Sequence, residues 1–189
     1  MAIRDGDVGS LSFSPDGTAL AAGDRLHGRV RLFDGQTGEV KQVWDAAHSG
    51  PVRGVAFSPD GRFLVSISED KTLKFWDVGS RTLWSTPSGN KGVLNAVAFS
   101  PAGTLLATAG TMKENDKNLP EVILWDATSW RLKETLPDQM VFVYALAFSP
   151  DGKTLAIGGG KRGDLEKDGG KVTGEIKLLP MEEPTAKQD

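Results

Sequence analysis

The 189-residue chain contains no cysteine, only two histidines and a single tyrosine. The lack of cysteine excludes disulfide bridges, thiolate metal sites and thiol catalysis. Two histidines cannot supply a three-histidine metal centre. The 22 basic and 25 acidic residues leave a net charge of -3. Because no excess of positive charge is present to attract phosphates, we predict that nucleic acid is not a partner.

Long apolar stretches are also absent. No segment approaches the roughly 20 apolar residues that a membrane-spanning helix needs. The first residues, Met1 to Asp7, lack the apolar core of a secretory signal. Hydrophobic residues still make up 39% of the chain, which is enough for a globular core. We therefore predict a cytoplasmic protein that makes no contact with a membrane.

A seven-residue phrase with phenylalanine at its third position recurs four times. The copies are Leu11–Gly17, Val55–Gly61, Val97–Gly103 and Leu146–Gly152. Their phenylalanines are separated by 44, 42 and 49 residues, and they are Phe13, Phe57, Phe99 and Phe148. This spacing is close to the period of about 40–45 residues expected for the four-stranded blades of a β-propeller. The chain is therefore predicted to be an all-β repeat protein.

The second copy shows how one repeat is built. Its apolar and polar residues alternate in a way that predicts strands at Val52–Phe57, Phe63–Ser68, Lys71–Trp76 and Thr82–Ser85. The Ser-Pro-Asp-Gly turn closes the first hairpin, because proline fixes φ and glycine tolerates a positive φ. The four copies predict blades at residues 1–46, 47–88, 89–136 and 137–180, followed by a tail at 181–189. The fourth blade is expected to lack its own outer strand, since prolines follow its third strand.

The third strand of each repeat carries a second phrase. It reads Val30–Asp34, Leu73–Asp77 and Val122–Asp126, with Ile176–Pro180 as a degenerate fourth copy. Two of these copies end in Trp-Asp. Together the phrases resemble the WD40 family, and the resemblance covers roughly Val8 to Leu179. It implies a WD40-type β-propeller and a non-catalytic scaffold that displays loops and edges to other proteins.

The resemblance also implies a buried hydrogen-bond network in the second repeat. Its members would be His48, Ser66, Asp70 and Trp76, with Ser68 as the alternative hydroxyl. The position equivalent to His48 is occupied in the other repeats by Arg4, Asn90 and Gln139. We therefore expect the other blades to be held mainly by apolar packing.

The histidine, serine and aspartate of this network are also the only grouping available for nucleophilic catalysis. The structural network explains them without an active site, so we predict no catalytic residue and no enzyme. The alternative class is a propeller that binds a ligand or metal, or catalyses a reaction, in its central channel.

The turn between the second and third strands is short in the second repeat and longer in the others. The expansions are Asp24–Gly28, Thr111–Pro120 and Lys161–Thr173. Equivalent turns of a propeller project from one rim, so they predict either a face for an unknown protein partner or idle, solvated loops. The predicted partner-binding residues are Lys113, Glu114, Asp116, Lys117, Arg162, Asp164, Glu166, Lys167 and Asp168.

Part of the last expansion is similar to a calcium loop. Carboxylates alternate at Asp164, Glu166 and Asp168, and Glu175 occupies the twelfth place. Glu166 is longer than the usual ligand there, and strands are expected on both sides where the calcium loop has helices. The favoured interpretation is a solvated hairpin, so no metal or cofactor is predicted. Weak calcium binding by Asp164 to Glu175 stays open.

Four repeats are too few for a WD40 ring of usual size. A ring of four would need wedges of about 90°. The small residues on the second strands, such as Ala21, Ala107 and Ala156, indicate narrower wedges. We predict that two copies pair through blades 1 and 4 and close eight blades as a homodimer. The alternatives are a fragment of a longer propeller, a compact four-bladed monomer and a half ring completed by another protein.

Overall fold

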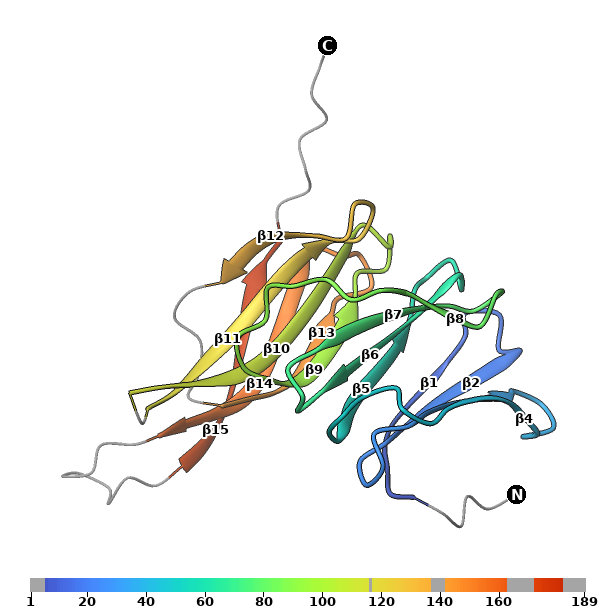
Figure 1. Cartoon of the computed structure of the whole chain (residues 1–189). Helices are drawn as coiled ribbons and strands as arrows, with labels where there is room; N and C mark the ends of the chain where they lie inside the picture. The colour runs from blue at the N-terminus through green and yellow to red at the C-terminus, as the bar shows by residue number, and fades with distance from the viewer. Residues whose placement is uncertain (1–5, 116, 137–141, 163–171, 182–189) are drawn as a thin grey trace.

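The computed structural model describes residues 6–115, 117–136, 142–162 and 172–181. Within these ranges the chain forms fifteen strands and no helix. Figure 1 shows the strands grouped into successive sheets joined by turns. The prediction of an all-β fold is confirmed.

Four antiparallel sheets follow one another along the chain. The first contains β1 (Val8–Phe13), β2 (Ala19–Asp24), β3 (Val30–Asp34) and β4 (Val40–Trp44). The second contains β5 (Val52–Phe57), β6 (Phe63–Ser68), β7 (Leu73–Asp77) and β8 (Thr82–Ser85). The third contains β9 (Val93–Phe99), β10 (Leu105–Glu114), β11 (Lys117–Asp126) and β12 (Arg131–Leu136). The fourth has three strands in the described ranges, β13 (Phe142–Phe148), β14 (Thr154–Arg162) and β15 (Val172–Pro180).

Local turn chemistry sets the strand boundaries. Gly61 closes the β5–β6 hairpin at a φ of 71°, a conformation that glycine adopts without a steric penalty. Lys71 also has a positive φ, 70°, so the tight turn after β6 extends through it. The third strand of this sheet therefore begins at Leu73, two residues later than the sequence predicts.

The prediction that Thr111–Pro120 forms a loop is wrong. These residues continue β10 and β11 as a ladder in which Thr111 pairs with Pro120 and Glu114 pairs with Lys117. Asn115 stands at the turn with a φ of 47°, which asparagine tolerates in a tight hairpin. Because the two strands satisfy each other's backbone groups, the expansion needs no core beneath it.

The predicted loop Lys161–Thr173 is likewise shorter than expected. β14 runs to Arg162 and pairs there with Val172, the first residue of β15. Figure 1 shows that the β10–β11 and β14–β15 hairpins both extend beyond the main body of their sheets. Both expansions are thus hairpins whose strands are longer than those of the first two sheets.

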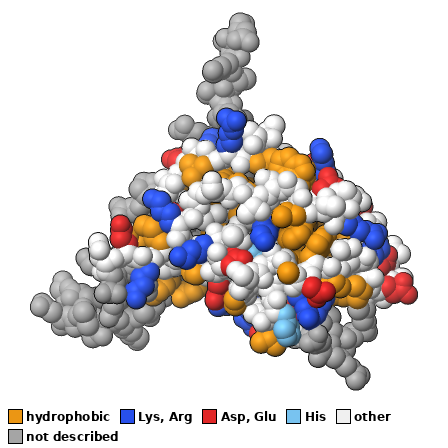
Figure 2. Space-filling model, in the orientation of Figure 1, with side chains coloured by type: hydrophobic (Ala, Val, Ile, Leu, Met, Phe, Trp, Pro, Cys, Tyr) orange, Lys and Arg blue, Asp and Glu red, His pale blue; other side chains and the backbone are white. Residues whose placement is uncertain are grey.

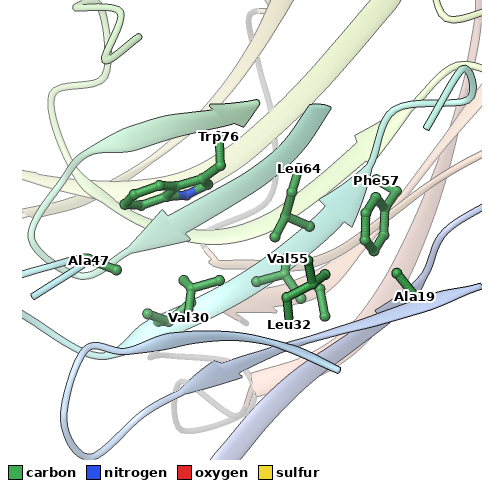
Figure 3. Packing of buried hydrophobic residues seen from close by; sticks show 10 residues of the cluster. Ala19, Val30, Leu32, Ala47, Val55, Phe57, Leu64 and Trp76 are labelled. Atoms are coloured by element: carbon green, nitrogen blue, oxygen red, sulfur yellow. The ribbon is translucent and has the colours of Figure 1, made fainter. Parts of the chain in front are cut away.

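Apolar side chains of each sheet pack against the next sheet. Figure 3 shows Val30 and Leu32 of the first sheet facing Val55 and Phe57 of the second. The same positions form the contact between the second and third sheets and between the third and fourth. The packed third-strand pairs are Leu73 and Phe75 in the second sheet and Val122 and Leu124 in the third.

The sheets are arranged as four blades of a propeller in chain order. The first strands carry this arrangement, since β1 contacts β5, β5 contacts β9 and β9 contacts β13. Figure 1 places the first and last sheets at opposite ends of the row. The described part of the chain therefore forms an arc of blades.

Truncating a residue of this core tests the packing. Leu106 is fully buried between the second and third sheets, so Leu106→Ala should lower the free energy of unfolding by about 2–5 kcal/mol. The matched control is Leu83→Ala, because Leu83 is exposed on β8. Urea unfolding should show a loss below about 1 kcal/mol for the control. Equal losses for the two variants would contradict this packing.

Candidate functional site

The structure brings the four side chains of the expected network together in the second sheet. His48 lies in the segment before β5, with Nε2 2.7 Å from the Ser66 hydroxyl. The Trp76 indole donates to the same hydroxyl oxygen over 2.8 Å. His48 Nδ1 lies 3.1 Å from an Asp70 carboxylate oxygen. Ser68, the alternative hydroxyl, instead accepts a hydrogen bond from the Asp70 backbone N–H in the turn.

These contacts fix the protonation of His48. The ionised Asp70 carboxylate can only accept, so Nδ1 of the neutral imidazole carries the proton that faces it, and Nε2 is left to accept from the Ser66 hydroxyl. Nδ1 also lies 2.8 Å from the Thr72 hydroxyl oxygen, which donates its own proton to Asp70. Burial lowers the pKa of His48 to about 4, against the opposing effect of the Asp70 charge. The imidazole is neutral near pH 7.

Asp70 holds the turn that precedes β7. Burial raises the pKa of its carboxyl, but hydrogen bonds from the hydroxyl and backbone N–H of Thr72 outweigh this effect, and the net shift is downward. The carboxylate also accepts the Ser49 backbone N–H over 2.9 Å. Asp70 thus joins the turn to the segment that leads into β5.

The serine, histidine and aspartate have the spacing of a catalytic triad, yet the serine is out of reach. Ser66 is fully buried. Its oxygen is already bonded to both His48 and Trp76, so no direction is left open for a substrate carbonyl. The arrangement therefore connects strands to a turn and offers no accessible nucleophile.

The third blade combines apolar packing with a reduced form of the network, so the expectation that it is held mainly by apolar packing stays a prediction. Trp125 donates its indole N–H to the Thr108 hydroxyl over 2.9 Å, and that hydroxyl lies 3.4 Å from the Asn90 side-chain oxygen. Thr108 stands at the position of Ser66, and Asn90 stands at the position of His48. The alignment of the repeats contained this signal, because both residues keep a hydrogen-bonding group.

The first blade uses a different polar centre, which the sequence reasoning missed. Asp24, almost fully buried at the end of β2, accepts the backbone N–H groups of Leu26 and His27 over 2.8 and 3.1 Å. Burial raises the pKa of its carboxyl, and these hydrogen bonds lower it further than burial raises it. The Arg31 guanidinium lies 3.7 Å from the Asp24 carboxylate. Asp24 therefore fixes the turn between β2 and β3.

The two ends of the row of blades expose residues that are buried inside it. Phe13 on β1 is 59% exposed, whereas Phe57, at the same position of the next repeat, is 7% exposed. Leu11 is 58% exposed, and its counterpart Val55 is buried. The difference arises because β5 has the first sheet in front of it, and no sheet of the described chain covers β1.

The fourth sheet shows the complementary face. Ile176 and Leu178 on β15 are 75% and 65% exposed. Val30 and Leu32, at the same positions on β3, are buried against the second sheet. Both faces that form the contacts between neighbouring blades are thus left uncovered, one at each end.

The inner strands line a shallow hollow. Arg53, Asn95 and Tyr144 occupy the same position on β5, β9 and β13, and they surround a cavity of about 200 Å³. Arg53 is held by Glu69 over 2.7 Å, and the Asn95 amide donates to the Val143 carbonyl over 3.3 Å. The described residues contain no group of three or more His, Asp or Glu placed to hold a metal ion.

The predicted partner-binding residues fall in different places. Lys113 and Glu114 are exposed near the tip of the β10–β11 hairpin. Lys117 begins β11 and Arg162 ends β14. The remaining predicted residues lie outside the described part of the chain and are Asp116, Asp164, Glu166, Lys167 and Asp168. The last four belong to the possible calcium loop. Glu175 lies on β15, paired with Gly159.

Charge is spread over the surface. Figure 2 shows basic and acidic side chains interspersed with apolar ones on the face that it displays. Across the ranges that the structure describes, no helix is long and apolar enough to cross a bilayer.

The buried imidazole should make stability depend on pH. The unfolded histidine titrates near 6.5 and the folded one near 4, so the unfolded chain binds an extra proton between these values. The free energy of unfolding should therefore fall by roughly 3 kcal/mol as the pH drops from 6.5 to 4. His48→Asn, which places the residue of Asn90 in this blade, should reduce that slope in urea unfolding. An unchanged slope would show that His48 does not titrate there.

Removing the shared hydroxyl of each network should show which network contributes more to the free energy of unfolding. Ser66→Ala leaves both His48 Nε2 and the Trp76 indole without a buried partner, and should lower the free energy of unfolding by about 2–4 kcal/mol. Thr108→Ala removes one short bond and one long one, so its loss should be smaller, about 1–2 kcal/mol. Thermal and urea unfolding measure both losses. The reverse order would be incompatible with the hydrogen bonds described above.

A family of repeat sequences matches this chain four times. The family described as "WD domain, G-beta repeat" matches residues 4–34, 38–77, 81–118 and 130–164. From the second match on, each begins just before the outer strand of a sheet, β4, β8 or β12. The family repeat and the sheet are therefore offset by one strand, so the outer strand of one blade belongs to the repeat of the next.

Several known proteins are similar to parts of this chain. WD repeat-containing protein 1 of Gallus gallus is 34% identical over 124 residues, covering 60% of this chain and 20% of that protein. Small ribosomal subunit protein RACK1 of Caenorhabditis elegans is 34% identical over 111 residues, covering 58% and 32%. WD repeat-containing protein VIP3 of Arabidopsis thaliana is 30% identical over 150 residues, covering 67% and 45%.

The chain thus spans less than half the length of each of these relatives. The family match nevertheless covers all four repeats and most of the described strands. The repeated phrases, the four sheets and these matches agree, and the chain belongs to the WD40 family.

Proposed function

We propose that the chain is a non-catalytic scaffold of the cytoplasm that binds other proteins and closes its propeller by pairing with a second copy of itself. One observation carries the second part of this proposal. The third-strand positions that are exposed on β15 are buried at all three contacts between blades, and the first-strand positions that are exposed on β1 are buried or partly buried there. Exposed apolar faces of this kind mark interaction sites in soluble proteins.

The two exposed faces are complementary. Inside the chain, the third-strand residues Val30 and Leu32 pack on Val55 and Phe57 of the following blade. Ile176 and Leu178 are the equivalents of the first pair, and Leu11 and Phe13 are the equivalents of the second. The β15 face of one copy would therefore meet the β1 face of another in the way that neighbouring blades already meet.

A two-fold axis along the central channel would make this contact twice. Each copy contributes one β1 face and one β15 face, so two copies leave no face uncovered. The closed assembly would contain eight blades. Two alternatives use the same faces: further blades of a longer chain, or another protein that completes the half ring.

Partner proteins are proposed to bind at the end of the blades formed by the turns between second and third strands. The β10–β11 hairpin places Lys113 and Glu114 there, exposed and beyond the body of the sheet. Similarity to RACK1, whose name describes a protein of the small ribosomal subunit, supports a role within larger assemblies. The residues Asp116, Lys117, Arg162, Asp164, Glu166, Lys167 and Asp168 complete the proposed surface.

Measurement of mass in solution tests the pairing. The 20.2 kDa chain should sediment at twice that mass at micromolar concentration. Leu178→Asp places a charge on the β15 face and should return the mass to that of one chain, with the circular dichroism spectrum unchanged because Leu178 is exposed. The control is Leu83→Asp, since Leu83 is exposed on β8 away from both end faces.

Each other result has a definite meaning. A wild-type mass of one chain at micromolar concentration contradicts pairing and favours further blades or another protein as the cover. A series of larger masses contradicts closure at two copies, because open contacts of this type would add chains without limit. Loss of dimer in Leu83→Asp alone would place the contact elsewhere.

A further inference from the structure

A second hollow lies between the second and third blades, away from both end faces. It has a volume of about 400 Å³, and its walls include Pro59, Asp60, Phe63, Trp84, Ala102 and Trp130. Phe63 begins β6, Trp84 lies on β8, and the others come from the β5–β6, β9–β10 and β11–β12 turns. In an antiparallel blade those turns lie at the end opposite the turns between second and third strands. The hollow is therefore separate from the proposed partner face.

Aromatic rings form one wall. The Phe63 ring lies 5.2 Å from the Trp84 ring and 5.3 Å from the Trp130 ring, measured between centroids. Trp84 is 47% exposed. Trp130 has a φ of 57°, at a turn position where the first two blades have Gly38 and Arg81. A bulky residue is strained there, so the third blade places an aromatic ring at this hollow against the local preference of the backbone.

Comparison of the blades shows that the second blade has a tryptophan where its neighbours have a lysine. Trp84 occupies the strand position at which the first blade has Lys41 and the third has Lys133. Lys41 forms an ion pair with Asp34 over 2.9 Å. The equivalent aspartate of the second blade, Asp77, lies 3.7 Å from the Arg62 guanidinium and accepts the Ser80 backbone N–H over 2.9 Å.

Arg62 shows which kind of group the wall accepts. Its guanidinium lies 4.8 Å from the centre of the Phe63 ring, within the range of a cation–π interaction. Its side chain is 65% exposed, so solvent reaches it freely. Asp60 adds a negative charge, because a hydrogen bond from the Ser58 hydroxyl, joined by the Arg62 backbone N–H, holds the pKa of its carboxyl below the ordinary value against burial.

We propose that this hollow binds an arginine side chain of a partner protein. The guanidinium would stack on the Trp84 and Phe63 rings and displace Arg62 from the Phe63 face. Asp60 and Asp77 would then supply the complementary negative charge. Arginine fits better than lysine because a planar guanidinium can stack on a ring while it hydrogen-bonds to a carboxylate. The proposal rests on the proposed scaffold function but not on closure of the ring.

The test uses the full chain labelled with ¹⁵N and three peptides that differ at one residue. Ac-Ala-Arg-Ala-NH₂ is compared with the same peptide carrying citrulline, a neutral analogue of arginine, or lysine. The indole N–H signals of Trp84 and Trp130, assigned with Trp84→Phe and Trp130→Phe, are followed during titration to millimolar peptide. The arginine peptide should shift them in a saturable way, the lysine peptide should bind more weakly, and the citrulline peptide should leave them unmoved.

Two variants distinguish binding from packing. Trp84→Lys restores the residue type of the neighbouring blades and should weaken binding of the arginine peptide about fivefold or more. Arg62→Gln removes the internal competitor and should strengthen it severalfold. A site that serves only to pack the core would give no gain in Arg62→Gln. Lys41→Gln, an exposed change on the first blade, is the control and should bind as the wild type does.

The proposal fails if the arginine peptide produces no saturable shift, if citrulline or lysine binds as well as arginine, or if Arg62→Gln weakens binding. Should Trp84→Lys fail to fold, Arg62→Gln still decides, because Arg62 is exposed. The mass of the chain is recorded in the same samples. A dimer without arginine binding overturns this inference alone, and arginine binding by a single chain leaves it standing while the pairing fails.

Discussion

The contact between neighbouring sheets is the interaction on which this structure depends. Each blade has one apolar face made by its first strand and another made by its second and third strands. Neither face is buried by the blade itself. Phe57 and Phe13 have the same sequence context, yet one is buried and the other exposed, because only Phe57 has a blade in front of it. Burial of these residues therefore depends on the neighbouring blade, and the two ends of the row are left with uncovered apolar faces.

The hydrogen-bond networks act on a smaller scale. His48, Ser66 and Trp76 tie the segment before a blade to its second and third strands. Thr108 and Trp125 do the same in the third blade with a threonine in place of the serine. The fourth blade has Ile157 and Leu179 at the matching positions and relies on apolar packing. Networks thus stiffen individual blades, while the contacts between sheets fix the order of the blades.

Much of the fold could be predicted because it is encoded locally. The Ser-Pro-Asp-Gly turns and the alternation of apolar residues fixed three of the four strands in the second sheet, and missed the start of β7 by two residues at Lys71. The hairpin at Thr111–Pro120 could not be predicted from its polar composition, since its ladder is stabilised by backbone pairing that any such residues can form. The hollow around Trp84 depends on rings from two blades, which only a three-dimensional arrangement brings together.

The central claim is that an apolar residue on the face of a blade is buried only where another blade packs against it. It can be measured by ¹⁹F NMR of fluorophenylalanine-labelled protein, using the solvent isotope shift of the Phe13 and Phe57 signals over a dilution series. Phe57 should be protected at every concentration, and Phe13 should be solvent-exposed when dilute and become protected as the copies associate. Protection of Phe13 in the dilute single chain, or exposure of Phe57, would contradict the account.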